Sequence, residues 1–435
     1  MNHLIQIPVP RDIPLDLPLA HWLLVVLLII SFLIHILFIN LMLGGTILTL
    51  WYEIKGLKKK KYDFLAKEIA TTITVNKSLA VVLGVAPLLT INVLYTVYFY
   101  AANALTGIMW ISIVPWVAVA FLFLYAHKYL WEKLENNKPL HIGLISIALL
   151  SFLFIPFIFL SNINLMLFPE KWEMVHGFAS TLTLSNVIPR YFHFITASIA
   201  ITGLFLVFYF KRRTYILPAE FEDMSKGELI KNGYNITFLA TIIQFIFGPL
   251  LFLTLPTNGI NWTLFFVILT GVSFAIVGLI YIWKEINAEK EMGKYAVPIL
   301  IIFSVTVILM GTGRQIYRAN ALKPHQELVF EKSVFHQRMV EKVTSGELSS
   351  NSVTETNPGK ALFEANCTVC HDMQKRLVGP PITEIVSPYI GKKDELKNWI
   401  KSPGKKRNDY PVMTAFPNLT ETELNSISDY FLNLK

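Results

Sequence analysis

The sequence has few charged residues and almost no cysteine. Of its 435 residues, 16% are Asp, Glu, Lys or Arg and 54% are hydrophobic. Soluble globular domains contain about 25% charged residues, so this composition disfavours a water-soluble enzyme. The two cysteines, Cys367 and Cys370, are too few and too close together for a disulfide framework, and they leave a single site to explain.

The charged residues are unevenly distributed along the chain. Of the 38 basic and 30 acidic residues taken together, 39 lie in the first 320 positions and 29 in the last 115. This contrast predicts a membrane part followed by an ordinary soluble part. The net charge of +8 does not indicate a nucleic-acid partner, because most lysines lie in short loops between apolar runs.

Several apolar stretches are long enough to cross a hydrocarbon core of about 30 Å. Their interiors lack the alternation of barrel strands, so we expect an all-α fold, a polytopic transmembrane bundle of about eight helices. The stretches run at about 20–50, 78–101, 107–130, 142–167, 188–210, 233–255, 262–283 and 295–313.

The loops between these stretches predict the orientation. Those near 51–77, 127–141, 211–232 and 284–294 hold 18 Lys and Arg, whereas the opposite loops before the eighth span hold three. By the positive-inside rule both termini face the outer side. The opening segment lacks the pattern of a cleaved signal peptide. We therefore expect a multi-pass protein in the lipid of a bacterial inner (cytoplasmic) membrane, with both termini periplasmic.

The sequence becomes polar after the last apolar stretch, which predicts three parts. Residues 1–320 are predicted to form the transmembrane domain and 321–357 a periplasmic linker. The stretch 343–358, at the end of this linker and reaching the first residue of the next domain, has the composition of a flexible linker. Residues 358–435 form a small all-α domain. Its size is marginal for an independent core, so a bound cofactor would help it to fold.

The strongest motif is Cys367-Thr368-Val369-Cys370-His371, a C-x-x-C-H sequence. This is the signature of covalent c-type haem attachment: two thiols on one turn bond to one porphyrin, and the histidine supplies an axial nitrogen. A redox dithiol or part of a zinc site are the alternatives. Zinc would need two more ligands, and only His371 is near in sequence.

The sequence around this motif resembles a class I cytochrome c domain over essentially all of residues 358–435. Gly379-Pro380-Pro381 forms a turn that would cover one haem edge, and Met413 precedes a terminal amphipathic helix. The resemblance implies one covalent haem c with His371 and Met413 as axial iron ligands, a pair that raises the haem potential. Met373 lies too near His371 to reach the opposite haem face. Haem attachment takes place outside the cytoplasm, in agreement with the orientation.

Two histidines lie within apolar stretches, where ionisable residues are costly. His35 lies near the middle of the first stretch and His193 at the outer end of the fifth. From physics alone, each is either a haem ligand or a satisfied core histidine.

The local sequences resemble subunit I of cytochrome bd quinol oxidase over about 20–315. The resemblance implies one or two b-type haems, with His35 and His193 as iron ligands and Arg314 as a neighbour of a haem or its propionate. The matching segments are the residues after His35, Ala197-Ser198 and Gly203 after His193, Gly84-Val85-Ala86, and Gly313-Arg314-Gln315.

The chain also departs from that family. The glutamate after Gly-Val-Ala becomes Asn92, the methionine of the low-spin haem becomes Leu269, and the glutamate before Gly-Arg-Gln becomes Gly311. The long quinol-binding loop is replaced by the short turn 255–259. These changes speak against quinol oxidation at the usual place and against a full set of three haems.

The other histidines are assigned no chemistry. His176 is expected in a solvated loop, and His127, beside Lys128, is expected to extend to the inner interface. The remaining histidines are expected at interfaces or in exposed segments: His3, His21, His141, His325 and His336.

The leading hypothesis is a membrane-anchored c-type cytochrome of a respiratory chain, whose c haem passes electrons to or from intramembrane haem. With those haems retained it would be an oxidoreductase, a terminal-oxidase-like subunit fed by cytochrome c; its catalytic residues are not assigned. Expected partners are other respiratory subunits and a soluble or membrane-bound electron donor or acceptor protein. The alternatives are a non-catalytic anchor that docks cytochrome c into a larger complex, and a quinol:cytochrome c reductase.

Overall fold

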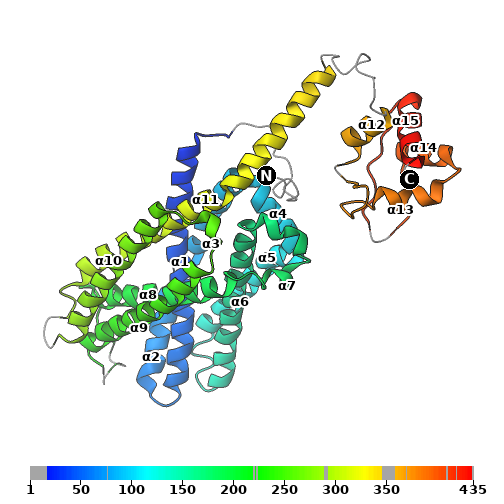
Figure 1. Ribbon diagram of the computed structural model, residues 1–435. Helices are drawn as coiled ribbons and strands as arrows, with labels where there is room; N and C mark the ends of the chain where they lie inside the picture. Colours follow the sequence, from blue (N-terminus) through cyan, green and yellow to red (C-terminus); the bar gives the residue numbers. More distant parts are fainter. Residues whose placement is uncertain are drawn as a thin grey trace. The chain divides into compact units, whose positions relative to one another are not determined.

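The protein is described by a computed structural model, in which the described residues form helices joined by turns and contain no strand (Figure 1). The all-α prediction is therefore confirmed. The described residues are 17–75, 77–218, 221, 224–288, 292–344, 358–368, 370–407, 410–417 and 419–433. The chain divides into two compact units, Met1–Phe335 and His336–Lys435.

The first unit contains seven helices that are long and apolar enough to cross a membrane. They are α1 (His21–Gly56), α5 (Ile108–Tyr129), α6 (Lys138–Met166), α8 (Val187–Lys211), α9 (Lys226–Leu253), α10 (Trp262–Ile286) and the Ala296–Phe335 part of α11 (Ala296–Thr344). The amphipathic helix α2 (Lys60–Val75) packs against α1. Shorter helices fill the loops: η2 (Pro169–Met174), α7 (Phe178–Thr181) and η4 (Thr257–Gly259).

The second apolar stretch, predicted at about 78–101, is broken into α3 (Lys77–Leu94) and α4 (Thr96–Thr106), which meet at an angle of 111°. The break falls at Tyr95, which is buried and accepts a 2.8 Å hydrogen bond from the Gln315 side chain. Among the described residues there are seven candidate spans, or eight if the bent pair is one span, in agreement with the prediction of about eight.

Glycine and polar side chains bring the central helices into close contact. A Cβ added to Gly44 of α1 would lie 2.2 Å from the carbonyl oxygen of Ser198 on α8. A Cβ added to Gly203 of α8 would lie 2.9 Å from the carbonyl oxygen of Gly233 on α9. Small residues are the usual means of packing membrane helices, because lipid gives no hydrophobic drive for helix association.

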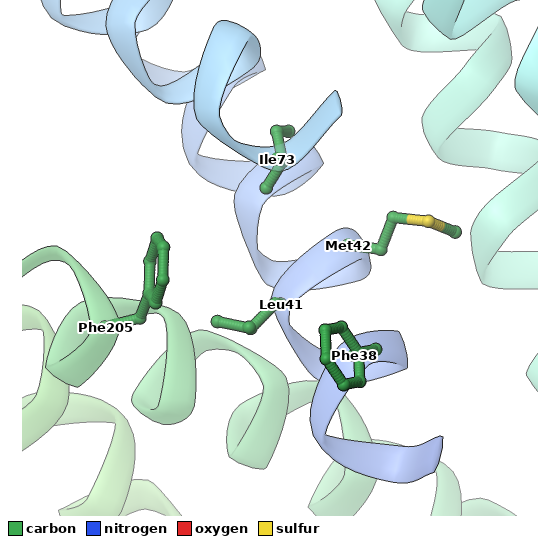
Figure 2. Close-up of a pocket in the computed structure, with 5 residues that line it drawn as sticks. All are labelled: Phe38, Leu41, Met42, Ile73 and Phe205. Atoms are coloured by element: carbon green, nitrogen blue, oxygen red, sulfur yellow. The ribbon is translucent and has the colours of Figure 1, made fainter. Parts of the chain in front are cut away.

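A small hollow lies between α1, α2 and α8 (Figure 2). Its lining side chains are hydrophobic, and the thioether of Met42 is the only heteroatom among them. The lining residues are Phe38, Leu41, Met42, Ile73 and Phe205.

Helix α11 continues to Thr344, so the first part of the segment assigned to a linker from the sequence is helical. The first turns of this segment still pack against the membrane unit through Leu322, Leu328 and Val329, and the added polar residues do not interrupt the helix. Most of the segment predicted to be flexible, 345–357, lies outside the described residues.

The second unit begins with the end of α11. Its described residues from 358 on form α12 (Pro358–Asn366), α13 (Ile382–Val386), the 3-10 turn η5 (Ser387–Tyr389), α14 (Lys393–Lys401) and α15 (Glu421–Leu432). Helices α12 and α15 cross closely, since a Cβ on Gly359 would lie 2.0 Å from the carbonyl oxygen of Ser426. Phe363 and Phe431 pack edge to face at this crossing. A capping box between Thr420 and Glu423 begins α15.

Candidate redox sites

The C-x-x-C-H motif begins where α12 ends. The Cys367 amide donates to the Phe363 carbonyl and the His371 amide to the Cys367 carbonyl, both at 2.8 Å, so the helical turn continues through the motif. Both cysteines are free thiols; Cys367 is buried and Cys370 half-buried, while Val369 lies outside the described residues. One turn therefore carries both thiols and the histidine, as attachment to a single porphyrin requires.

The orientation of His371 is held by the turn that follows the motif. Its Nδ1 lies 2.7 Å from the carbonyl oxygen of Pro380, which can only accept, so Nδ1 carries the proton. The Nε2 lone pair is left to act as an iron ligand. Gly379 lies directly against the ring, and its amide donates to the Cys370 carbonyl at 2.7 Å. The Gly-Pro turn thus positions His371, in addition to the haem-covering role predicted for it.

The electrostatics of the motif follow from burial and from backbone amides. Burial raises the pKa of the Cys367 thiol to about 11, so the free thiol is protonated at neutral pH. The Asp372 carboxylate accepts from the amides of Gln374 and Lys375 at 2.9 and 2.8 Å, which lowers its pKa. This carboxylate closes the loop immediately after His371.

The two methionines near the motif differ in their surroundings. Met373 is half-buried and packs against the apolar core of the second unit. Met413 is half-buried in the irregular segment between α14 and α15. Neither methionine lies in a helix, and the role of Met413 as the second ligand stays a prediction.

Comparison with known families identifies the second unit. A family model described as cytochrome c matches residues 356–435. The C-terminal unit is a cytochrome c domain. Such a domain carries haem c and transfers electrons, and the two thiols with the free Nε2 of His371 fit that haem. No curated protein matches the chain.

His35 lies on α1 and His193 on α8, two of the candidate spans. Each has a buried Nδ1 without a hydrogen-bond partner among the described residues. His35 packs against Gly84 of α3, where an added Cβ would lie 2.8 Å from Cε1. The ring of His193 faces Gly248 of α9 at ordinary contact distance. Neither imidazole is therefore a fully satisfied core histidine.

His35 and His193 lie at the same level of the bundle. The Ser198 hydroxyl donates to the Asn40 side chain at 2.9 Å, and contacts further along both helices show that α1 and α8 run in the same direction. Each histidine precedes its partner in this bond by five residues, or about 7.5 Å at 1.5 Å per residue.

Three arginines of the membrane unit, Arg190, Arg314 and Arg318, have no acidic partner among the described residues. Arg190, one turn before His193, lies within electrostatic range of Arg314 and Arg318 on α11. Among the described residues, no carboxylate lies within ion-pair distance of any of the three. Their neighbours are neutral: Arg190 donates to Asn186, Arg318 donates to Gln315, and Arg314 lies 4.2 Å from the ring centroid of Phe32.

The sequence did not predict one buried cluster of titratable residues. His127 and His141, expected at the interface, are both fully buried together with Glu53. The prediction for them was wrong because their carboxylate partner lies 74 and 88 residues away. His325 is also buried, with Nε2 3.5 Å from Glu170. His176 and His21 are exposed as expected, whereas His3 and the His336 side chain lie outside the described part.

Proposed function

We propose that the cytochrome c domain exchanges electrons with b-type haem held by His193 and His35 in the membrane unit. The three arginines Arg190, Arg314 and Arg318, the first of which lies one turn before His193, are the observation that carries this proposal. Three guanidinium groups without a carboxylate partner would suit an anionic group of a bound cofactor.

Uncompensated cations inside a membrane protein are expensive, and such residues are retained where they pair with a functional group. Haem presents an iron to an imidazole and two carboxylates to cations. His193 with three guanidinium groups matches both requirements, and Arg314 would then be a partner of a propionate. The common level of His35 and His193 supports their acting in one redox region.

The site lies at the end of the bundle where α8 begins. Arg314 and Arg318 are on α11, the last helix of the membrane unit, and the cytochrome c domain comes next in the sequence. With the basic loops on the inner side, this end faces the periplasm. Electrons would enter or leave through haem c, and the partner would be a respiratory subunit or a donor or acceptor protein.

The resemblance to cytochrome bd subunit I agrees with this arrangement, but the chain lacks several of that family's ligands. Asn92, Leu269 and Gly311 offer no iron ligand of the expected type. Electron transfer between haem c and one or two b haems is therefore the function we propose, with oxygen reduction as an extension that needs an open iron site. If no b haem is bound, the membrane unit is an anchor that docks the cytochrome c domain.

The test compares full-length His193→Ala with His176→Ala, a change at an exposed histidine. Reduced-minus-oxidised spectra should show loss of at least half of the b-type absorbance in His193→Ala and none in His176→Ala, with equal c-type absorbance. Unchanged b-type absorbance in His193→Ala, or its absence from the wild type, would overturn the proposal.

A further inference from the structure

A second group of buried ligands lies at the other end of the membrane unit. Glu53 is near the end of α1, His127 near the end of α5 and His141 near the start of α6. In Figure 1 the α1–α2 and α5–α6 hairpins run side by side toward this end, and contacts of α1 with α6 and of α2 with α5 join them. The side chains of Glu53, His127 and His141 are fully buried.

The three side chains converge on one point. His127 Nε2 lies 2.8 Å from one Glu53 carboxylate oxygen, and His141 Nδ1 contacts the other. The imidazole rings stack with centroids 4.0 Å apart, and Trp131 packs edge-on against both. One ligand atom from each residue lies within 4.8 Å of the other two.

Hydrogen bonding shows that this group needs a cation. His141 Nε2 lies 2.8 Å from the backbone carbonyl of His127, which only accepts, so Nε2 carries the proton. In a neutral imidazole, His141 Nδ1 is then a lone pair, and it faces the Glu53 carboxylate, which is also an acceptor. Two acceptors in contact require either an added proton or a metal ion between them.

The charges around Glu53, His127 and His141 also call for an added positive charge, from a proton or a metal ion. Lys138 pairs with Asp63 at 2.7 Å and lies 3.9 Å from Glu53. Two carboxylates and one ammonium leave one negative charge when both imidazoles are neutral. Burial makes that charge costly without a counter-ion.

We propose that Glu53, His127 and His141 bind a divalent first-row transition-metal ion. A neutral His127 can donate to Glu53 from Nε2, and one added proton would complete the contact of His141, whereas a metal ion would engage all three side chains at once. Two imidazole nitrogens and the two carboxylate oxygens supply four donor atoms, a set that suits zinc and its neighbours. The His141 bond to the His127 carbonyl is the outer hydrogen bond that commonly orients a metal-binding histidine. The ion would join three helices at the inner ends of their spans.

The experiment uses full-length protein in detergent, stripped with a chelator, reloaded with Zn²⁺ and desalted. We expect about one zinc per chain in the wild type and in the control His176→Gln. Glu53→Gln and His141→Gln should each bind at least tenfold less. The zinc X-ray absorption spectrum is unaffected by haem iron, and for the wild type it should show two imidazole ligands.

Equal zinc content in the wild type and both ligand variants would overturn the proposal, as would a wild-type spectrum without imidazole. If the variants do not fold, the wild-type spectrum and stoichiometry still decide. Wild-type protein that keeps no zinc would indicate that a proton alone bridges Glu53 and His141.

Discussion

The Nδ1 atom of His371 lies 2.7 Å from the carbonyl oxygen of Pro380. This bond joins the haem-attachment motif to the turn that follows it, and it orients the imidazole before any iron is bound. The predictions for the cytochrome c domain follow from this contact and from the residues around it.

Gly379→Ala should disturb the His371 ring. The new Cβ would lie 2.4 Å from His371 Cε1 and 2.7 Å from Nδ1, so the ring or the turn must move. We expect a loss of about 1–3 kcal/mol in unfolding free energy, typical of overpacking, and a shifted haem c potential. The unfolding free energy is measured by denaturant titration with haem absorbance as the signal. The haem c potential is measured by redox titration.

Gly404→Ala is the control for that change, because its Cβ would meet Trp399 only at 3.7 Å. It should leave both quantities nearly unchanged. Identical unfolding curves for the two variants would contradict the described packing of His371.

Met413→Leu should lower the potential of haem c, because a thioether ligand stabilises the reduced iron. The drop should be a sizeable part of the roughly 0.8 V range that axial ligands span across haem proteins. Met373→Leu replaces the methionine in the apolar core with a side chain of similar volume and should leave the potential nearly unchanged. A reversed pattern in the redox titrations would assign the ligand to Met373.

Asp372→Asn should remove part of the acid sensitivity of the cytochrome c domain. The folded-state pKa of Asp372 lies below its ordinary value of 3.8, so its carboxylate stabilises the fold above that pH. The contribution is lost as the pH falls through the lowered pKa. Asn keeps the acceptor oxygen without the charge. The stability difference between wild type and variant, measured by denaturant titration from pH 7 to pH 3, should therefore shrink on acidification. A difference independent of pH would contradict this role.

Arg318→Gln should lower the potential of the proposed b haem. Ferric haem carries one more positive charge than ferrous haem, and a nearby guanidinium disfavours the ferric form. Arg213→Gln, at an exposed position outside this cluster, is the control and should leave the b-haem potential unchanged. Spectroelectrochemical titration of the full-length protein measures the b-haem potential in each of the two variants. An equal effect of the two changes would argue against an anion beside Arg318.

The coarse fold and the haem c site were predictable because each depends on local sequence. Apolar length predicts spans one at a time, and Cys367, Cys370 and His371 lie on a single turn. The bend at Tyr95 was not predictable, because the apolar run there is continuous and the buried partner of Tyr95, Gln315, lies 220 residues away.

The same limit applies to the polar clusters. Glu53, His127 and His141 each lie at the end of an apolar run, where a polar residue is ordinarily expected to reach the interface. Only the packing of three helices brings them together. The helical course of 321–344 was missed for another reason: loss of apolar residues ends a membrane span without ending a helix.

The central claim is that the chain carries b-type haem in its membrane unit in addition to haem c. The most direct measurement is haem content by pyridine haemochrome in purified full-length protein, with acid–acetone extraction to separate covalent from non-covalent haem. The account predicts one covalent c-type haem per chain together with one or two extractable b-type haems. Covalent haem alone would contradict it.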